Sequence, residues 1–162
     1  MKFVAGCNLE EFKRYIKRIG LYKGAGQLDE LERMLKNRLL NLIVWRENGE
    51  IIGHAIWHET NTEEHRKGDP RDKEDKEALE RLLGGKKDFV ELHEIWLMKE
   101  HRGKGYGKKF FGFFEEFMRK RGFDSIVYYA NHPAAVHICR NRGCKEEYLK
   151  QIGEYVFYIR LN

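Results

Sequence analysis

Apolar and polar residues alternate along the first half of the chain in patterns that predict a short strand, two helices and a hairpin. Residues 2–5 alternate weakly, as an edge strand does. Apolar residues recur at helical spacing over residues 9–19 and again over 28–40. Two short apolar runs then flank an Asn48-Gly49 pair. This pair is typical of a tight hairpin turn, because both positions of that turn need a positive φ.

The second half predicts a longer alternation of strands and helices. Residues 106–120 carry an arc of phenylalanines and one methionine, which predicts a helix packed against a sheet. In order, the patterns predict a strand at 88–98, a helix at 106–120, a strand at 125–130, a helix at 133–141 and strands near 145–150 and 154–161. These elements indicate a mixed α/β (α+β) fold in a single domain, residues 1–162, with a mostly antiparallel central sheet of about six to seven strands flanked by helices.

A charged insert interrupts this pattern at about residues 59–86. Its first part, residues 59–79, holds eight acidic and five basic side chains and almost no apolar ones. The favoured interpretation is a solvated loop that leads into a short helix, residues 73–83, ended by the Gly84-Gly85 pair. A mobile cover over a substrate site is the alternative, because long loops in compact domains are often lids.

Composition narrows the class of protein. The chain has 162 residues, of which 41% are hydrophobic and 13% aromatic, so it can bury one core and does not read as disordered. No apolar run approaches the ~18 residues of a membrane-spanning helix, and the first residues lack a signal-peptide pattern. Three cysteines, an odd number, fit a reduced cytoplasmic protein better than a disulfide framework. The net charge of +5 indicates an anionic partner, which is a nucleotide cofactor, a nucleic acid or an acidic substrate.

A glycine-rich turn at residues 100–109 carries the clearest chemistry. Glycines at alternate positions from 103 to 107 let successive N–H groups point inward, as an anion nest at the start of a helix. The P-loop pattern fails here, because Phe110 stands where that motif needs Ser or Thr. The GxGxxG dinucleotide pattern fails as well, because Lys108 occupies the third glycine position.

In this context the chain resembles the GNAT (Gcn5-related N-acetyltransferase) superfamily. Residues 102–107 (RGKGYG) match the R/Q-x-x-G-x-G/A acetyl-CoA motif, between a strand that carries polar residues and an amphipathic helix. Residues 131–143 (NHPAAVHICRNRG) resemble the family's Asn-x-x-Ala…Gly helix. The resemblance covers about residues 88–149, and it implies a GNAT-like acyl-CoA N-acyltransferase fold with acetyl-CoA as the cosubstrate.

The resemblance also implies which residues hold acetyl-CoA. The backbone near Leu97 would bind the pantetheine arm. Asn131 falls where the family often places a CoA-contacting side chain, and His132 is an equal candidate by spacing. The pyrophosphate would lie on the backbone N–H groups of Arg102, Gly103, Lys104, Gly105, Tyr106, Gly107 and Lys108.

A catalytic base is needed, because an alkylamine with a pKa of ~10.4 is deprotonated at pH 7 only about once in 10³ to 10⁴ molecules. By the resemblance, Glu91 falls on the position of the catalytic glutamate of histone-type members, and His93 is the second choice. Glu94 falls where other branches carry an acidic residue. Strand alternation puts Glu91 and His93 on one face and Glu94 on the other, unless a bulge shifts the register. Alternatively, Glu91 is only solvated or paired.

Cys139 occupies the position of the family's usual tyrosine, the general acid. A thiol can protonate a departing thiolate; alternatively, this cysteine is only a small buried hydrophobic residue. Solvent is a further alternative for the proton, and so are four tyrosines, Tyr128, Tyr129, Tyr155 and Tyr158. His54 and His58 share a strand face and could border the acceptor site, although ordinary strand histidines are the favoured interpretation.

The resemblance implies an acetyl-CoA-dependent N-acetyltransferase that acts on a primary amine by direct attack in a ternary complex. The alternative is a non-catalytic acyl-CoA-binding or sensor protein with the same fold, which the missing tyrosine supports. No metal is expected, because Cys139 and Cys144 lack a second ligand pair at zinc spacing. The expected partner is an amine of unknown identity, with no membrane and no nucleic acid, and a homodimer is left open.

Overall fold

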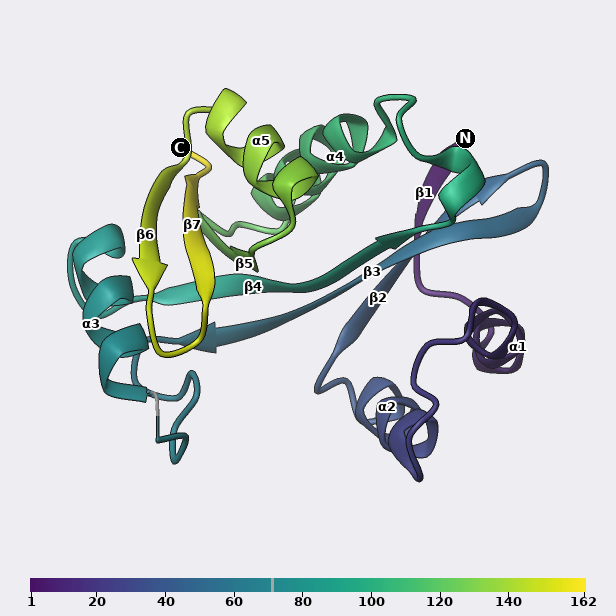
Figure 1. Cartoon of the computed structure of the whole chain (residues 1–162), viewed down its shortest axis with the longest axis horizontal. Helices are drawn as coiled ribbons and strands as arrows, with labels where there is room; N and C mark the ends of the chain where they lie inside the picture. Colours follow the sequence, from purple (N-terminus) through teal and green to yellow (C-terminus); the bar gives the residue numbers. More distant parts are fainter. Residues whose placement is uncertain (71) are drawn as a thin grey trace. The chain divides into compact units, whose positions relative to one another are not determined.

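The computed structural model describes residues 1–70 and 72–162 and is a mixed α/β fold (Figure 1). Within these residues, seven strands form a sheet in the order β1-β2-β3-β4-β5-β7-β6. The pair β4–β5 is parallel, whereas β1–β2, β2–β3, β5–β7 and β6–β7 are antiparallel. The strands are β1 (Lys2–Ala5), β2 (Asn41–Glu47), β3 (Glu50–Asn61), β4 (Asp88–Leu97), β5 (Ser125–Ala130), β6 (Lys145–Leu149) and β7 (Glu154–Arg160). The fold class predicted from the sequence is therefore confirmed.

The helices agree closely with the prediction. They are α1 (Leu9–Ile19), α2 (Gln27–Lys36), α3 (Asp72–Leu83), α4 (Tyr106–Lys120) and α5 (Pro133–Asn141), with a short 3₁₀ turn at Lys99–His101. Only α2 is clearly shorter than predicted. It ends where the N–H of Asn37 bonds to the carbonyl of Arg33 and Arg38 takes a positive φ of 57°. Among the described residues, no helix has the length and apolar character needed to cross a membrane.

The chain forms two compact units. The first comprises Met1–His58 and His93–Tyr106, and the second comprises Glu59–Leu92 and Gly107–Asn162. Strands β3 and β4 contribute residues to both units. The single domain expected from the sequence stays a prediction.

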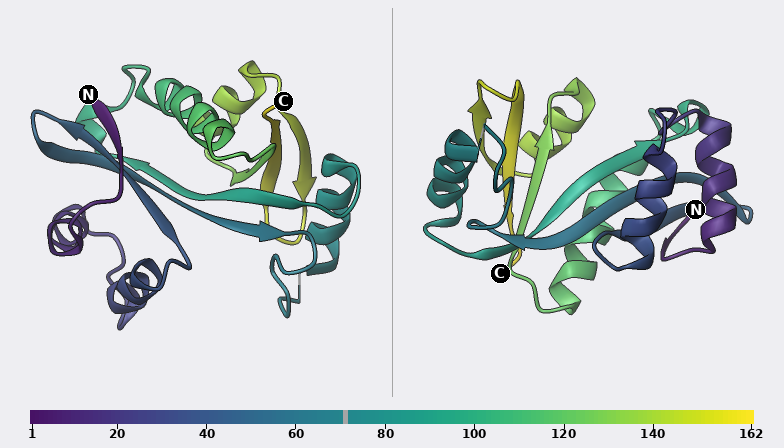
Figure 2. Two further views of the ribbon diagram at one scale, coloured as in Figure 1. Left: turned by 180° about the vertical axis from the view of Figure 1, so that it is seen from behind. Right: turned by 90° about the horizontal axis from the view of Figure 1, so that it is seen from below.

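In the first unit, α1 and α2 pack on strands β2 and β3 (Figures 1 and 2). Helix α1 begins at Asn8, whose side-chain oxygen accepts hydrogen bonds from the backbone N–H groups of Glu10 and Glu11 at 3.0 and 3.1 Å. Side chains from the helices and the strands share one core, which contains Phe12, Tyr15, Ile16, Leu31, Leu42, Val44, Ile51 and Ile56. This core fixes the face of α1 that carries Tyr15.

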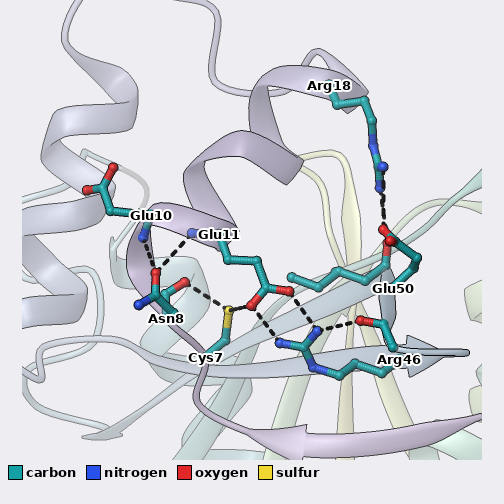
Figure 3. A network of polar contacts seen from close by, with 9 residues as sticks. Cys7, Asn8, Glu10, Glu11, Arg18, Arg46 and Glu50 are labelled. Atoms are coloured by element: carbon teal, nitrogen blue, oxygen red, sulfur yellow. Dashed lines mark hydrogen bonds and ion pairs between the residues drawn. The ribbon is translucent and has the colours of Figure 1, made fainter.

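An ion pair ties α1 to the hairpin that joins β2 and β3 (Figure 3). Arg46 donates from Nη1 and Nη2 to the two carboxylate oxygens of Glu11 at 2.7 and 2.9 Å, and from Nη1 to the carbonyl of Gly49 at 3.0 Å. The turn has φ values of 52° at Asn48 and 80° at Gly49, both positive as the sequence predicts. A bidentate arginine–carboxylate pair fixes orientation as well as distance, so the helix is held against this hairpin.

In the second unit, helices pack on both faces of the strands. Helix α4 buries Phe110, Phe111, Phe114 and Met118, and the ring of Phe111 lies 5.5 Å from that of Tyr128. On β5 the neighbouring residue Val127 belongs instead to the core that α3 covers. Because successive strand residues point to opposite faces, α3 and α4 cover opposite faces of these strands.

Part of the charged insert is packed into the core of the second unit, whereas residues 63, 64, 67, 68 and 70 are exposed. Helix α3 places four apolar residues in the core of the second unit, namely Ala78, Leu79, Leu82 and Leu83, together with Phe89 and Val127. His65 and Asp75 are buried as well. The prediction of a helix was right, but that of a solvated loop before it was wrong for His65, whose ring is held by the side chain of Asp75. Residue 71 of this insert lies outside the described residues.

Candidate active site

Four hydrogen-bonded polar side chains, two of them buried and two partly buried, lie together in the first unit as the Glu94 chain. Tyr15 comes from α1, His54 from β3, Glu94 from β4 and Tyr22 from the connection between α1 and α2. The Tyr15 hydroxyl lies 2.9 Å from Nδ1 of His54, and Nε2 of His54 lies 2.5 Å from Oε2 of Glu94. The Tyr22 hydroxyl donates to Oε1 of Glu94 at 2.8 Å. One carboxylate is therefore supported through both of its oxygens.

The geometry of these hydrogen bonds shows which side chains donate to Glu94. Burial, and after it the charge of Glu94, raises the pKa of Tyr15, so this phenol keeps its proton at neutral pH. Because a carboxylate only accepts, Nε2 of His54 carries the hydrogen of its contact with Glu94 and donates it, while Nδ1 of the same ring faces the Tyr15 hydroxyl. Burial and the Glu94 carboxylate likewise raise the pKa of Tyr22. Both groups that face Glu94 are thus donors.

Glu94 is held as a carboxylate. Burial alone would raise the pKa of Glu94, but hydrogen bonds from His54 and Tyr22, with the charge of His54, lower it below its ordinary value. A carboxylate has about four acceptor sites, and these two donors use one on each oxygen. The side chain is still 27% exposed. Glu94 can therefore accept a further hydrogen bond from a molecule that arrives from solvent.

Tyr22 reaches Glu94 from a strained backbone position. Its φ is 55°, in the left-handed region that residues with a Cβ rarely adopt. Such strain costs on the order of 1–3 kcal/mol and is found most often at functional sites. In this backbone conformation the Tyr22 hydroxyl donates its hydrogen bond to Glu94.

Glu91 and His93, the first and second choices for the catalytic base, differ in burial. Glu91 is buried, and its Oε2 lies 3.0 Å from Nε2 of His65. His93 is exposed, and its ring lies 6.0 Å from that of His58. Of the two, only His93 is open to a substrate from solvent.

The glycine-rich segment has the backbone of an anion nest. Gly103 and Gly105 have φ values of 75° and 79°, and α4 begins directly afterwards at Tyr106. A Cβ on either glycine would meet nothing within 4 Å, so these positions require glycine for its φ and not for space. The first N–H groups of a helix lack intrahelical partners, and the exposed Lys104 and Lys108 add positive charge.

Two of the predicted CoA contacts are already engaged. The backbone N–H of Arg102 donates to the carbonyl of Lys99 at 3.1 Å, and its Nε donates to the carbonyl of Leu97 at 2.7 Å. The Arg102 N–H and the Leu97 carbonyl thus each have one partner within the chain, and their contact with CoA stays a prediction. Asn131 is exposed at the end of β5, whereas Nδ1 of its neighbour His132 accepts from the N–H of Ala134 as a helix cap. The cap favours Asn131 over His132 as a ligand contact.

Cys139 is fully buried in α5. A hydrogen bond with Cys144, and after it burial, raises the pKa of Cys139, so this thiol stays protonated. A group that reacts must touch the substrate, and this side chain has no exposed surface. The packing alternative is therefore the better account of Cys139.

We expect Cys139→Ala to keep the turnover rate within about threefold of wild type and to cost about 1 kcal/mol of stability, because it removes one buried sulfur atom. The measurements are steady-state thiol release and denaturant unfolding. A fall in turnover of about 10²-fold or more with unchanged stability would instead show that Cys139 acts as the general acid.

Sequence patterns missed the roles of Tyr15, Tyr22 and His54. The sequence pattern predicts Tyr15 as one more apolar position of α1 and His54 as an ordinary strand histidine. The one available signal was that His54 stands in an otherwise apolar run of β3, where a buried polar side chain needs a partner.

Comparison with known proteins shows the family. The family model described as "Acetyltransferase (GNAT) family" matches residues 10–143. The chain belongs to this family, as its glycine motif predicts, and it is a GNAT-type N-acetyltransferase, a class of enzyme that uses acetyl-CoA as cosubstrate. A comparison with curated protein sequences gives no significant match.

Solved structures share the fold at low sequence identity. A polyamine N-acetyltransferase of Drosophila melanogaster aligns with a TM-score of 0.67 and 11% identity over 98% of this chain and 100% of that chain. Arylalkylamine N-acetyltransferase 2 of Aedes aegypti gives 0.64 and 16% over 99% of each chain. Ribosomal-protein-alanine N-acetyltransferase of Brucella melitensis gives 0.62 and 14% over 99% and 98%. At such low sequence identities these structures show that the fold is shared and nothing more.

Proposed function

We propose that this protein transfers the acetyl group of acetyl-CoA to a primary amine by direct attack in a ternary complex, with Glu94 as the group that receives the amine. The observation that carries the proposal is the support of Glu94 by His54 and Tyr22 on its two oxygens. The amine nitrogen bonds to the acetyl carbonyl carbon as the carbon–sulfur bond breaks, which gives an amide and the free thiol of CoA.

Glu94 takes this role in place of Glu91 for an electrostatic reason. Although burial alone lowers the pKa of His65, its bonds to Asp75 and Glu91 raise that pKa to about 9, so the imidazole is positively charged at pH 7. The Glu91 carboxylate is therefore neutralised by a buried cation and shielded from solvent. Glu94 is ionised and part exposed, so it can hold an ammonium group, accept its proton and pass that proton to water.

The segment from Gly103 to Lys108 would hold the pyrophosphate of acetyl-CoA, and a contact from Asn131 stays a prediction of the resemblance. When bound, this cosubstrate supplies the reactive thioester. The nest N–H groups and the first turn of α4 would bind the pyrophosphate, and Lys104 and Lys108 would add charge that attracts it. A cytoplasmic location stays a prediction from the odd number of cysteines.

The test is thiol release from acetyl-CoA with a panel of primary amines, alongside calorimetry with CoA. We expect amine-dependent release in equimolar amount with the acetylated amine. Tight CoA binding without turnover on any amine would contradict the proposal and favour the non-catalytic acyl-CoA-binding alternative.

We expect Gly105→Ala to weaken CoA binding by about 5- to 30-fold. Alanine pays roughly 1–2 kcal/mol in the left-handed region, so the free loop relaxes away from the binding conformation. Gly122→Ala is the matched control, because Gly122 has a φ of 86° and equal open space but follows the far end of α4. Both variants should lose similar stability, and calorimetry should show weaker CoA binding for Gly105→Ala alone. Equal affinities in the two variants would argue against the nest.

A further inference from the structure

A groove of about 370 Å³ lies in the first unit next to the Glu94 chain. It is lined mainly by apolar side chains of α2 and its flanking loops, and Tyr22 and His93 also line it. The apolar lining consists of Ala25, Leu31, Met34 and Leu40. Tyr22 lines the groove and its hydroxyl donates to Glu94, so one lining side chain is in direct contact with the carboxylate that would receive the amine.

The volume of the groove limits the size of the amine substrate that it can hold. Small-molecule pockets span about 300–1,000 Å³, so this groove stands at the small end of that range. A groove of this volume can hold a small amine but not a folded protein segment. Met34 adds a polarisable thioether that packs well against an aromatic ring.

The charged groups of the groove set its chemistry. Glu30 is the acidic residue among the described lining residues, and its two oxygens accept from Nη2 and Nε of Arg33 at 2.6 and 2.8 Å. Gln27 is engaged as well, since its Oε1 accepts from the N–H of Gly24 at 2.9 Å. A second ammonium group, as in a polyamine, would therefore meet an already neutralised carboxylate. An apolar substituent on the amine would need no charged partner in the groove, and burial of its surface would favour binding.

We propose that the acceptor is a primary amine with a compact hydrophobic body, such as an arylalkylamine, whose body lies on Leu31 and Met34 and whose nitrogen points to Glu94. This inference rests on the proposed function and names its substrate class. The solved relatives act on chemically different amines, so likeness of fold does not choose among them.

The test compares phenethylamine with spermidine and with an alanine-terminated peptide as acceptors. We expect kcat/KM for phenethylamine to exceed each of the others by at least tenfold, as contact with a hydrophobic pocket allows. Met34→Asp should lower that value at least tenfold, and Ala25→Trp should do so by filling the groove from an exposed position. The matched controls are Leu39→Asp and Leu39→Trp, because Leu39 is exposed on the same segment and does not line the groove.

Calorimetry of phenethylamine binding to the CoA complex separates the two proposals. Binding that Met34→Asp abolishes and Leu39→Asp retains supports the groove even if no amine turns over, in which case only the proposed function fails. A preference for spermidine or for the peptide overturns the substrate class and leaves the proposed function standing. Equal effects of the position 34 and position 39 variants, or no binding of phenethylamine, also overturn the inference.

Discussion

Glu94→Gln is expected to lower kcat/KM by about 10²-fold or more while CoA affinity stays unchanged. Glutamine keeps the shape of the side chain and one acceptor oxygen, but it cannot hold an ammonium group by charge or take its proton. Removal of a positioned proton acceptor costs typically about 10² to 10⁴ in rate. The variant should then depend on the small fraction of neutral amine in solution, so its rate should rise about tenfold for each pH unit up to the pKa of the amine. The measurement is the pH profile of thiol release.

Two further variants make this result decisive. Glu116→Gln is the matched control, because Glu116 is an exposed carboxylate paired with Arg119 on α4 and should leave the profile unchanged. Glu91→Gln tests the choice made from the sequence, under conditions where unfolding measurements show the variant to be folded. Loss of turnover in Glu91→Gln with full turnover in Glu94→Gln would overturn the assignment.

The sequence was informative where local chemistry decides the structure. Asn48-Gly49 fixes a turn through its own φ preferences, and the phenylalanine arc of α4 fixes a helix through its spacing alone. Gly103 and Gly105 of the nest act in the same way, because each supplies a positive φ at its own position. In each case the cause lies within a few residues of the effect.

The Glu94 chain was not predictable for the opposite reason. Its contacts join residues 39 and 40 positions apart in the sequence, so no spacing rule brings Tyr15, His54 and Glu94 together. The charged insert shows the same limit. Asp75 reads as a surface residue of α3, and only the packing of α3 on the strands buries it between His65 and Tyr129. The polar composition of the insert therefore predicted solvent-exposed side chains, whereas tertiary packing buries His65 and Asp75 as charged groups.

That ionic core leads to the second large effect, the dependence of stability on His65. Nδ1 of His65 lies 2.7 Å from Asp75 and Nε2 lies 3.0 Å from Glu91, and its ring stacks on Tyr129 with centroids 5.4 Å apart. The Tyr129 hydroxyl also donates to Asp75. Removal of one partner from a buried ion pair typically costs about 3–5 kcal/mol, because the remaining charges are left uncompensated. We expect His65→Gln to lose about this amount of unfolding free energy near pH 6.

The pH dependence distinguishes a charged His65 from a merely packed one. The folded pKa is about 9, above the ordinary value of 6.5, so the stabilisation is fully present below pH 6.5 and is lost as pH rises through 9. At about 1.36 kcal/mol per pH unit, the loss is roughly 3 kcal/mol. Denaturant unfolding of wild type between pH 6 and 9.5 should show this fall, and His65→Gln should abolish it. His137→Gln, at an exposed histidine of α5, should retain the wild-type slope, and the same slope in His65→Gln would show that His65 is not the cationic centre of the insert.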